Sequence, residues 1–232
     1  MLKTEMQTSP SIQVIIAALN EEQGIGPTIT EMIETLDGPR VLVVDGKSDD
    51  KTIEIAKKLN VSIAFQDGLG KGDALAKAFE HLNPGVKYVV LTDADYTYPA
   101  KFIPEMIKVL EENPFVGMVC GNRFGRKTHS GALDGVFYFG NLLLASFQNF
   151  LNRTTLIDPL TGLRVVRSDI LRKWKVKSRG FDVEVELNHQ VERQGFSIKE
   201  VEIQYRQRLG KKKLKPKHGF EILKRILLET IY

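Results

Sequence analysis

The 232-residue chain contains a single cysteine and a single tryptophan, and its four histidines are scattered. One cysteine, Cys120, excludes an internal disulfide framework, and no Cys or His residues have the spacing of a zinc site. No run reaches the ~18 consecutive apolar residues that span a bilayer, and residues 1–6 lack the apolar core of a signal peptide. These absences predict a protein of a reducing compartment, with no transmembrane segment in this chain.

Charge is unevenly distributed along the sequence. The net charge is +4, and from Arg206 to the C-terminus nine Lys and Arg residues stand against Glu221 and Glu229, so residues 1–205 carry a net −3. A diffuse surface for nucleic acid is therefore not expected, whereas a local anion site near the C-terminus is. The 42% hydrophobic and 27% charged residues are typical of a globular domain.

Short apolar runs alternate with helical patterns in the first half of the chain. The apolar runs lie at residues 12–17, 41–44, 61–65, 88–92 and 116–120, and the helical patterns at 20–36, 51–59, 74–82 and 102–110. In the second half, predicted strands at 163–166 and 198–205 flank a helical pattern at 184–194. This alternation predicts right-handed βαβ crossovers, an α/β class and a mostly parallel sheet.

Polar clusters follow four of the predicted strands at their carboxyl ends. They are Asn20-Glu21, Asp45, Gly70–Gly72 and Asp93-Ala94-Asp95. Ligands of open α/β sheets bind along that edge. Two carboxylates one residue apart can reach Mg²⁺ or Mn²⁺, which completes its shell with phosphates and water. An isolated Asp-x-Asp is more often a solvated pair in a loop, but the other three clusters favour a metal site.

Two segments leave alternatives open. Residues 68–73 lack the spacing of a P-loop, so they form either a flexible turn with a helix cap at Asp73 or a glycine-lined wall for a nucleotide or sugar. Residues 206–217, hereafter the basic segment, contain seven Lys and Arg among twelve residues. They form either a solvated face or tail, or a mobile loop that closes over phosphate groups.

Two amphipathic stretches bear on membrane contact. Residues 136–151 form either a core helix or an interfacial helix, in which Phe137, Tyr138, Phe139, Phe147 and Phe150 would face lipid. Residues 220–228 are amphipathic and basic. Together they predict peripheral association with a membrane surface. We expect a domain at residues 1–215 and a C-terminal basic amphipathic helix at 216–232.

In combination, the motifs resemble the family 2 glycosyltransferases of GT-A fold, in particular those that make polyprenyl- or dolichyl-phosphate hexoses. The matching elements occur in the family's order over about residues 12–214: Ile15–Glu22, Val43–Asp45 with Ser48, Asp50 and Thr52, Gly70–Ala74, Asp93–Asp95, Gly121–Phe124, Asp158 with Thr161–Arg164, Phe181 with Glu184 and Glu186, and Val201–Ile203 with Tyr205, Arg206, Arg208, Gly210, Lys213 and Leu214. The resemblance implies a Rossmann-like, three-layer αβα fold.

The resemblance also implies an activity and a site. The activity is inverting, metal-dependent transfer of a hexose from a UDP- or GDP-sugar to a polyprenyl or dolichyl phosphate, for glycan or glycoprotein assembly at the cytoplasmic face of the membrane. The implied catalytic residues are Asp93, Asp95, Arg206 and Arg208, with Mg²⁺ or Mn²⁺ on the two aspartates. The implied nucleotide-sugar site contains these four residues and Ala17, Leu19, Glu21, Asp45, Gly70, Lys71, Ala94, Arg123 and Lys213. Arg123 and Arg164 are also candidates for holding the acceptor phosphate or sugar hydroxyls.

Two other functions stay open at this point. A soluble family 2 transferase could act on a phosphorylated small acceptor or a glycan, and its residues 136–151 would be buried. A nucleotide-binding regulatory subunit without turnover would be expected to lack a metal carboxylate or the basic segment, and both are present. A separate membrane subunit and self-association stay open as further partners.

Overall fold

A computed structural model describes residues 11–125, 135–152, 154–215 and 217–231. The first half contains β1 (Ile12–Ala18), α1 (Ile25–Thr35), β2 (Arg40–Asp45), α2 (Thr52–Lys58), β3 (Ser62–Phe65), α3 (Lys71–Glu80), β4 (Tyr88–Asp93), a 3₁₀ turn (Ala100–Phe102), α4 (Ile103–Glu112) and β5 (Val116–Asn122). The second half contains α5 (Gly135–Asn152), β6 (Arg164–Arg167), α6 (Ser168–Arg172), α7 (Val183–Arg193), β7 (Ser197–Glu202) and α8 (His218–Ile231). The predicted α/β class is confirmed.

The strands form one seven-stranded sheet in the order β3-β2-β1-β4-β6-β5-β7. Only β6 among them runs antiparallel, to both β4 and β5, so the sheet is mostly parallel, as predicted. The chain crosses from β1 to β2 and β3 on one side, and β4 then pairs with β1 on the other. The strand order therefore reverses between β1 and β4, which is where open α/β sheets form a binding crevice.

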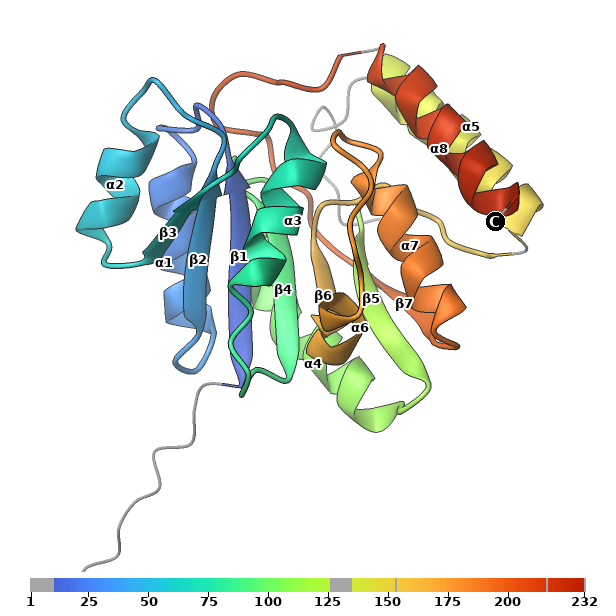
Figure 1. The fold of residues 1–232 in the computed structure, drawn as a ribbon, viewed down its shortest axis with the longest axis horizontal. Coiled ribbons are helices and arrows are strands. Elements are labelled where there is room, and N and C mark those ends of the chain that lie inside the picture. The colour runs from blue at the N-terminus through green and yellow to red at the C-terminus, as the bar shows by residue number, and fades with distance from the viewer. Residues whose placement is uncertain (1–10, 126–134, 153, 216, 232) are drawn as a thin grey trace, which may run out of the picture.

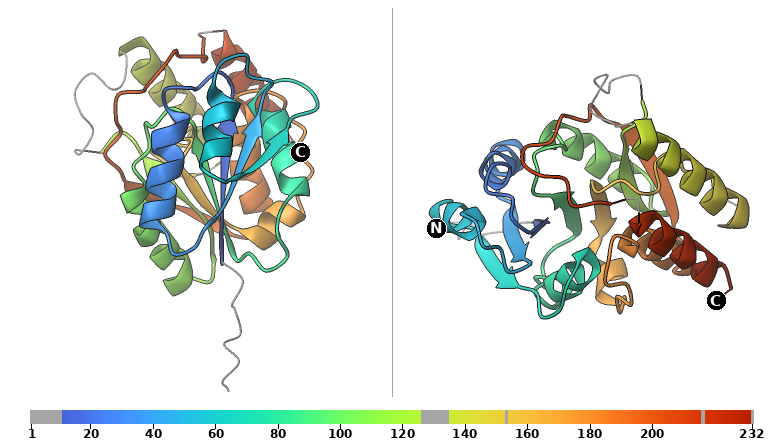
Figure 2. Two further views of the ribbon diagram at one scale, coloured as in Figure 1. Left: turned by 90° about the vertical axis from the view of Figure 1, so that its left-hand side faces the viewer. Right: turned by 90° about the horizontal axis from the view of Figure 1, so that it is seen from above.

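Helices cover both faces of the sheet (Figures 1 and 2). Successive side chains of a strand point to opposite faces. On β1, Val14 and Ile16 belong to the core shared with α1 and α4, whereas Ile15 belongs to the core shared with α3, α6 and α7. The uninterrupted apolar run of β1 is thus explained by burial on both faces. The result is the three-layer αβα architecture that the family resemblance implied.

Helices α5 and α8 lie side by side, outside α7 (Figures 1 and 2). Ile222 and Ile226 are four residues apart, so they share one face of α8. They are buried with Val185 of α7, and Leu144 and Leu151 of α5 pack against them. The C-terminal helix therefore packs on the body of the protein through a small apolar cluster.

The opposite face of α5 is apolar and exposed. Phe139 and Leu143 are both 71% exposed, and Phe150 is 81% exposed, whereas Ala145 on the inner face is 4% exposed. The helix thus combines the two alternatives of the sequence, because one side is core and the other is an apolar surface. Phe147 is also exposed, while the side chains of Phe137 and Tyr138 lie outside the described residues. No helix in the described ranges is long and apolar enough to cross a membrane.

Strand β7 ends at Glu202, three residues before the predicted end at Tyr205. The main chain changes its partner there. The Ile203 N–H still donates to Asn122 of β5, but the Arg206 N–H donates to the carbonyl of Thr97, beyond the end of β4. The basic segment is consequently drawn over the carboxyl edge of the sheet.

Candidate active site

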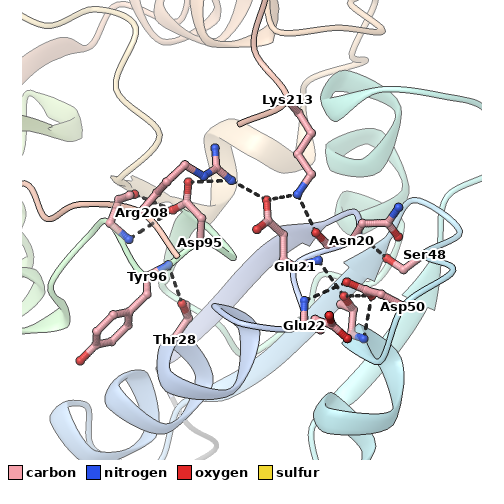
Figure 3. Close-up of polar contacts among 12 residues, drawn as sticks. Asn20, Glu21, Glu22, Thr28, Ser48, Asp50, Asp95, Tyr96, Arg208 and Lys213 are labelled. Carbon is pink, nitrogen blue, oxygen red and sulfur yellow. Dashed lines mark hydrogen bonds and ion pairs between the residues drawn. The ribbon is translucent and has the colours of Figure 1, made fainter. Parts of the chain in front are cut away.

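The candidate site lies at the carboxyl edge of β1 and β4, where the strand order reverses (Figure 1). The turn after β1 contains Glu21, and β4 leads into Asp93–Asp95. The basic segment connects β7 to α8, and on its way it passes over the turn after β1 and over the Asp93–Asp95 turn (Figures 1 and 3). Three parts of the chain that are far apart in sequence therefore meet at this edge.

Hydrogen bonds to the β2–α2 connection fix the turn after β1. Ser48 accepts the Asn20 N–H on its Oγ at 2.8 Å, and the Glu21 N–H donates to Thr52 Oγ1 at 2.8 Å. Ser48 also donates its N–H and its hydroxyl to the two carboxylate oxygens of Asp45, at 2.8 and 2.5 Å. Asp45 is fully buried. The structure thus places Asp45 beneath the edge, as a support of the turn that carries Glu21.

The N-terminal end of α1 supports the Asp93–Asp95 turn. A Cβ atom at Gly24 would lie 2.5 Å from the Ala94 carbonyl oxygen, so only glycine permits this close approach. Tyr96 has a φ of 64° and donates its N–H to Thr28 Oγ1 at 3.1 Å. The two contacts fix the direction in which the turn leaves β4.

Asp95 is the acidic residue of this turn that faces the basic segment (Figure 3). Thr97 donates its N–H and its hydroxyl to Asp95 Oδ1, at 3.2 and 2.6 Å. The other oxygen, Oδ2, lies 3.4 Å from Arg208 Nη2. Burial raises the pKa of the Asp95 carboxyl above its ordinary value, and the nearby charge of Asp93 acts in the same direction.

Asp93 has a different environment, because it is paired with Lys71. The Lys71 Nζ lies 2.6 Å from Asp93 Oδ1 and 2.7 Å from Glu184 Oε1. Burial opposes the charged form of Lys71, but the two carboxylates outweigh it and raise the pKa of Lys71 above its ordinary value. Gly162 leaves room for Asp93, since a Cβ there would lie 2.4 Å from Asp93 Oδ2. Lys71 is thus brought to the predicted site, but as the counter-ion of two acids.

The glycines around Lys71 allow close contact within the protein. Added Cβ atoms at Gly70 and Gly72 would lie 2.2 Å from the carbonyl oxygens of Arg179 and Ser178, respectively. Gly70 also has a φ of 87°, which favours glycine. The main chain of residues 178–179 therefore occupies the space beside these glycines. Asp73, expected to cap the following helix, lies instead inside the first turn of α3.

Arg208 and Lys213 converge on Glu21 (Figure 3). Glu21 Oε1 lies 2.8 Å from Arg208 Nη2 and 2.6 Å from Lys213 Nζ. Lys213 also donates to the Asn20 carbonyl at 2.7 Å. Burial raises the pKa of the Glu21 carboxyl above its ordinary value, against the opposing effect of Lys213 and Arg208. The structure thus brings together Glu21, Asp95, Arg208 and Lys213 of the predicted site.

Arg206 does not join this group. Its Nη1 and Nη2 donate to Glu31 Oε2 and Oε1, both at 2.7 Å, and its guanidinium carbon lies 4.3 Å from the centre of the Tyr96 ring. Sequence reasoning missed Glu31 and Tyr96. Glu31 lies in the middle of α1, 175 residues from its partner, so no local motif indicates the pair.

Arg123 and Arg164 point into the protein. Arg123 is 8% exposed, and its Nε and Nη2 donate to the two oxygens of Asp158, both at 2.7 Å. Arg164 is 1% exposed and donates to Asn188 Oδ1 and to the Pro159 carbonyl, each at 2.6 Å. Our expectation that Arg164 contacts an acceptor is wrong, because its guanidinium has no surface to offer. Arg123 shares this buried setting beside the site.

Three other predicted residues lie along β1 and β4. Leu19 is exposed, Ala17 at the end of β1 is half-buried, and Ala94 is buried. The turn after β1 therefore presents an apolar side chain, Leu19, next to the acidic side chain of Glu21.

Comparison with known proteins decides the family. The model of the family described as glycosyl transferase family 2 matches residues 13–174. This range contains β1 to β6 and most of the site described above. The chain belongs to glycosyl transferase family 2. It is therefore a glycosyltransferase.

Relatives of this family 2 glycosyltransferase include proteins of Haloferax volcanii. A dolichyl-phosphate hexose transferase is 32% identical over 215 residues, which cover 91% of this chain and 90% of that protein. The low-salt glycan biosynthesis hexosyltransferase Agl6 is 28% identical over 218 residues, but the chain spans only 52% of its length.

Solved structures show the same fold. Glucosyl-3-phosphoglycerate synthase from Mycobacterium tuberculosis, in complex with Mn²⁺, UDP and phosphoglyceric acid, has a TM-score of 0.76 at 21% sequence identity. The match covers 96% of this chain and 79% of that one. The expected GT-A fold is thereby confirmed.

The oxygen donors of the edge fit a divalent cation. Mg²⁺ and Mn²⁺ take one or two protein carboxylates and complete their shells with phosphates and water. Asp95 Oδ2 faces the positive charge of Arg208 at 3.4 Å, which a metal ion would replace, and Asp93 Oδ2 lies against Gly162. In the part of the chain that the structure describes, no three His, Cys, Asp or Glu side chains form a closed metal cage. The arrangement suits a cation that also binds a ligand phosphate.

Proposed function

We propose that this family 2 glycosyltransferase transfers a hexose from a UDP- or GDP-sugar to a polyprenyl or dolichyl phosphate. The observation that carries the proposal is the meeting of Arg208 and Lys213 with Asp95 and Glu21 at the sheet edge. Cationic side chains beside metal-binding carboxylates suit a diphosphate. Similarity to the dolichyl-phosphate hexose transferase supports a hexose as the transferred group and a polyprenyl-type phosphate as the acceptor.

In this proposal, Arg208 and Lys213 bind the diphosphate of the donor. Negative charge grows on that group as its bond to the sugar breaks, so fixed positive charge stabilises the transition state. Asp93 and Asp95 would hold Mg²⁺ or Mn²⁺, which neutralises the departing diphosphate when bound. The proposal leaves Arg206 out of the donor site, because both its terminal nitrogens donate to Glu31.

The acceptor phosphate attacks the anomeric carbon from the side opposite the departing diphosphate, so the configuration inverts. A phosphate monoester has a second pKa near ~6 and is largely dianionic at neutral pH. It therefore needs no strong general base. The positions of the described histidines agree with this, since His81 lies at the end of α3, His189 within α7 and His218 at the start of α8.

The apolar face of α5 and α8 supports a lipid-linked acceptor. Phe139, Leu143 and Phe150 of α5 are exposed, together with Phe220 of α8. Exposed apolar surface of this kind marks interaction sites. The Lys and Arg residues of the basic segment, which leads into α8, suit an anionic membrane. The proposal therefore includes peripheral association at the cytoplasmic face of a membrane.

A panel assay tests the proposal. The protein is incubated with Mg²⁺ or Mn²⁺, a polyprenyl phosphate and each of several labelled UDP- and GDP-sugars, and label is counted in the organic phase. We expect metal-dependent label in the organic phase with at least one hexose donor. Label that appears only on a soluble phosphorylated acceptor would contradict the lipid acceptor, and no transfer from any donor would contradict the whole proposal.

A further inference from the structure

The basic segment is attached to the protein through two sets of ion pairs that differ in kind. At its start, Arg206 donates both terminal nitrogens to the two oxygens of Glu31 at 2.7 Å. The Arg206 and Glu31 side chains are 27% and 19% exposed, and Tyr96 lies against the guanidinium. Bidentate pairing and stacking fix both the position and the plane of an arginine. This first attachment is therefore geometrically complete.

The second set is incomplete. Arg208 and Lys213 share the single oxygen Oε1 of Glu21, and besides it Arg208 has a contact with Asp95 Oδ2 at 3.4 Å and Lys213 a hydrogen bond to the Asn20 carbonyl. The other oxygen of Glu21 and the Nε of Arg208 are buried and have no hydrogen-bond partner. A buried polar atom without a partner carries a free-energy penalty. A ligand that offers several oxygens, such as a diphosphate, satisfies these cations better than one shared carboxylate oxygen does.

The main chain joins the two sets. The Arg206 N–H donates to the Thr97 carbonyl at 3.0 Å, and the Leu209 N–H donates to the Asp95 carbonyl at 3.0 Å. Arg208 lies between these two points, so its place over the site depends on where Arg206 is held. Glu31 also accepts the Ala100 N–H at 3.3 Å, which ties it to the chain that follows Asp95.

We propose that Glu31 is a positioning residue of the transfer reaction. Through Arg206 it holds the start of the basic segment, so that Arg208 and Lys213 can exchange Glu21 for the donor diphosphate while the segment stays over the site. This inference rests on the proposed function, because it takes a nucleotide diphosphate as the ligand of Arg208 and Lys213. Glu31 itself does not contact the ligand.

The test measures binding of UDP and GDP, each with Mn²⁺, by isothermal titration calorimetry. The variants are Glu31→Gln, Arg206→Gln, the charge exchange Glu31→Arg with Arg206→Glu, and the control Glu34→Gln. Glu34 is an exposed glutamate on the same helix. We expect Glu31→Gln and Arg206→Gln each to weaken binding roughly tenfold, the charge exchange to restore most of it, and Glu34→Gln to change it less than twofold.

A second measurement follows trypsin cleavage within residues 206–213 without ligand. We expect cleavage to be roughly tenfold faster in Glu31→Gln than in Glu34→Gln, because the first attachment is lost. If the wild type binds UDP or GDP and Glu31→Gln binds it equally well, the role of Glu31 is overturned, but the proposed function is not. Should Glu31→Gln fail to fold, Arg206→Gln and the charge exchange decide the same question. Failure of the wild type to bind either nucleotide would overturn the proposed function and this inference together.

Discussion

The charged residues of the edge form two groups with different partners. Lys71 lies between Asp93 and Glu184 and neutralises them. Asp95 instead faces Arg208, whose Nη2 lies 3.4 Å from Asp95 Oδ2. At the scale of single residues, Asp95 and Glu21 are the carboxylates whose partners change in the proposed function, when a donor and a metal bind.

Asp95→Asn tests this difference. The variant keeps the shape of the side chain but removes the charge that would hold a divalent cation, so transfer should fall by roughly 10²-fold or more while the fold persists. Initial rates with saturating Mn²⁺ measure the effect, and thermal unfolding checks the fold. The control is Asp49→Asn, the same chemical change at an exposed position of the β2–α2 connection. Full activity of wild type in excess chelator would contradict the metal assignment.

His189 makes stability depend on pH. Its side chain is 6% exposed, its Nε2 has no partner, and burial lowers the pKa of His189 from 6.5 to about 4. Between these values the unfolded chain binds a proton that the folded protein excludes. The free energy of unfolding therefore carries no penalty from His189 above pH 6.5. It falls as the pH falls from 6.5 towards 4, because the unfolded chain takes up the proton.

His189→Asn should remove this acid limb. Between pH 7 and pH 5, the loss of Tm should be about 4–8 °C smaller in the variant than in wild type. The exposed His81, changed to Asn, is the control. Glu192 acts in the opposite sense, because burial raises its pKa to about 7, so the variants must be compared with wild type at each pH. Equal acid sensitivity of wild type and His189→Asn would show that another group controls this range.

At the scale of elements, α5 has two faces with different tasks. Leu144 packs against the cluster with α8 and Ala145 is buried, whereas Phe139 and Phe150 are exposed. An exposed phenylalanine contributes little to the stability of the folded chain, so it can be replaced without unfolding the helix.

Phe139→Asp with Phe150→Asp tests the membrane proposal. The double variant should keep its Tm within a few degrees of wild type, but it should no longer pellet with anionic liposomes, since charge in the apolar face opposes insertion. Wild-type pelleting should weaken as salt is added. Ala145→Asp, on the buried face, is the positive control and should lower the Tm strongly. Unchanged pelleting of the double variant would place the membrane contact elsewhere or exclude it.

Most elements could be predicted from the sequence because their signals are local. The apolar run at residues 12–17 and the helical spacing at 102–110 depend on neighbours within a few residues. The end of β7 could not be predicted, because it is set by Thr97, which receives the Arg206 N–H. Apolar periodicity does not encode a main-chain partner that lies more than a hundred residues away in the sequence.

The site could be predicted only in part, for a similar reason. Strand-end positions indicated Glu21 and Asp95, and the family resemblance added Arg208 and Lys213; the structure brings these four residues together. The partners of individual cations could not be predicted, because each depends on a distant acid. Arg206 binds Glu31, a contact that only the folded chain reveals.

At the scale of the whole molecule, the basic segment joins the carboxyl edge of the sheet to helix α8, which lies beside α5 (Figure 1). The segment begins over β4 and ends at α8. A phosphate whose lipid chain contacts α5 and α8 would therefore be presented towards the edge that holds Arg208 and Lys213. In the proposed function, this arrangement lets one small domain combine a water-soluble donor with an acceptor that stays in the bilayer.

The central claim is that transfer takes place where Arg208 lies over Asp95. The most direct test is kcat/KM for hexose transfer to polyprenyl phosphate in wild type, Arg208→Ala and Lys211→Ala. Lys211 is an exposed cation of the same segment, so its loss removes equal charge. We predict a decrease of about one to two orders of magnitude for Arg208→Ala and less than about threefold for Lys211→Ala. Equal effects of the two variants, or wild-type kinetics of Arg208→Ala, would contradict the account.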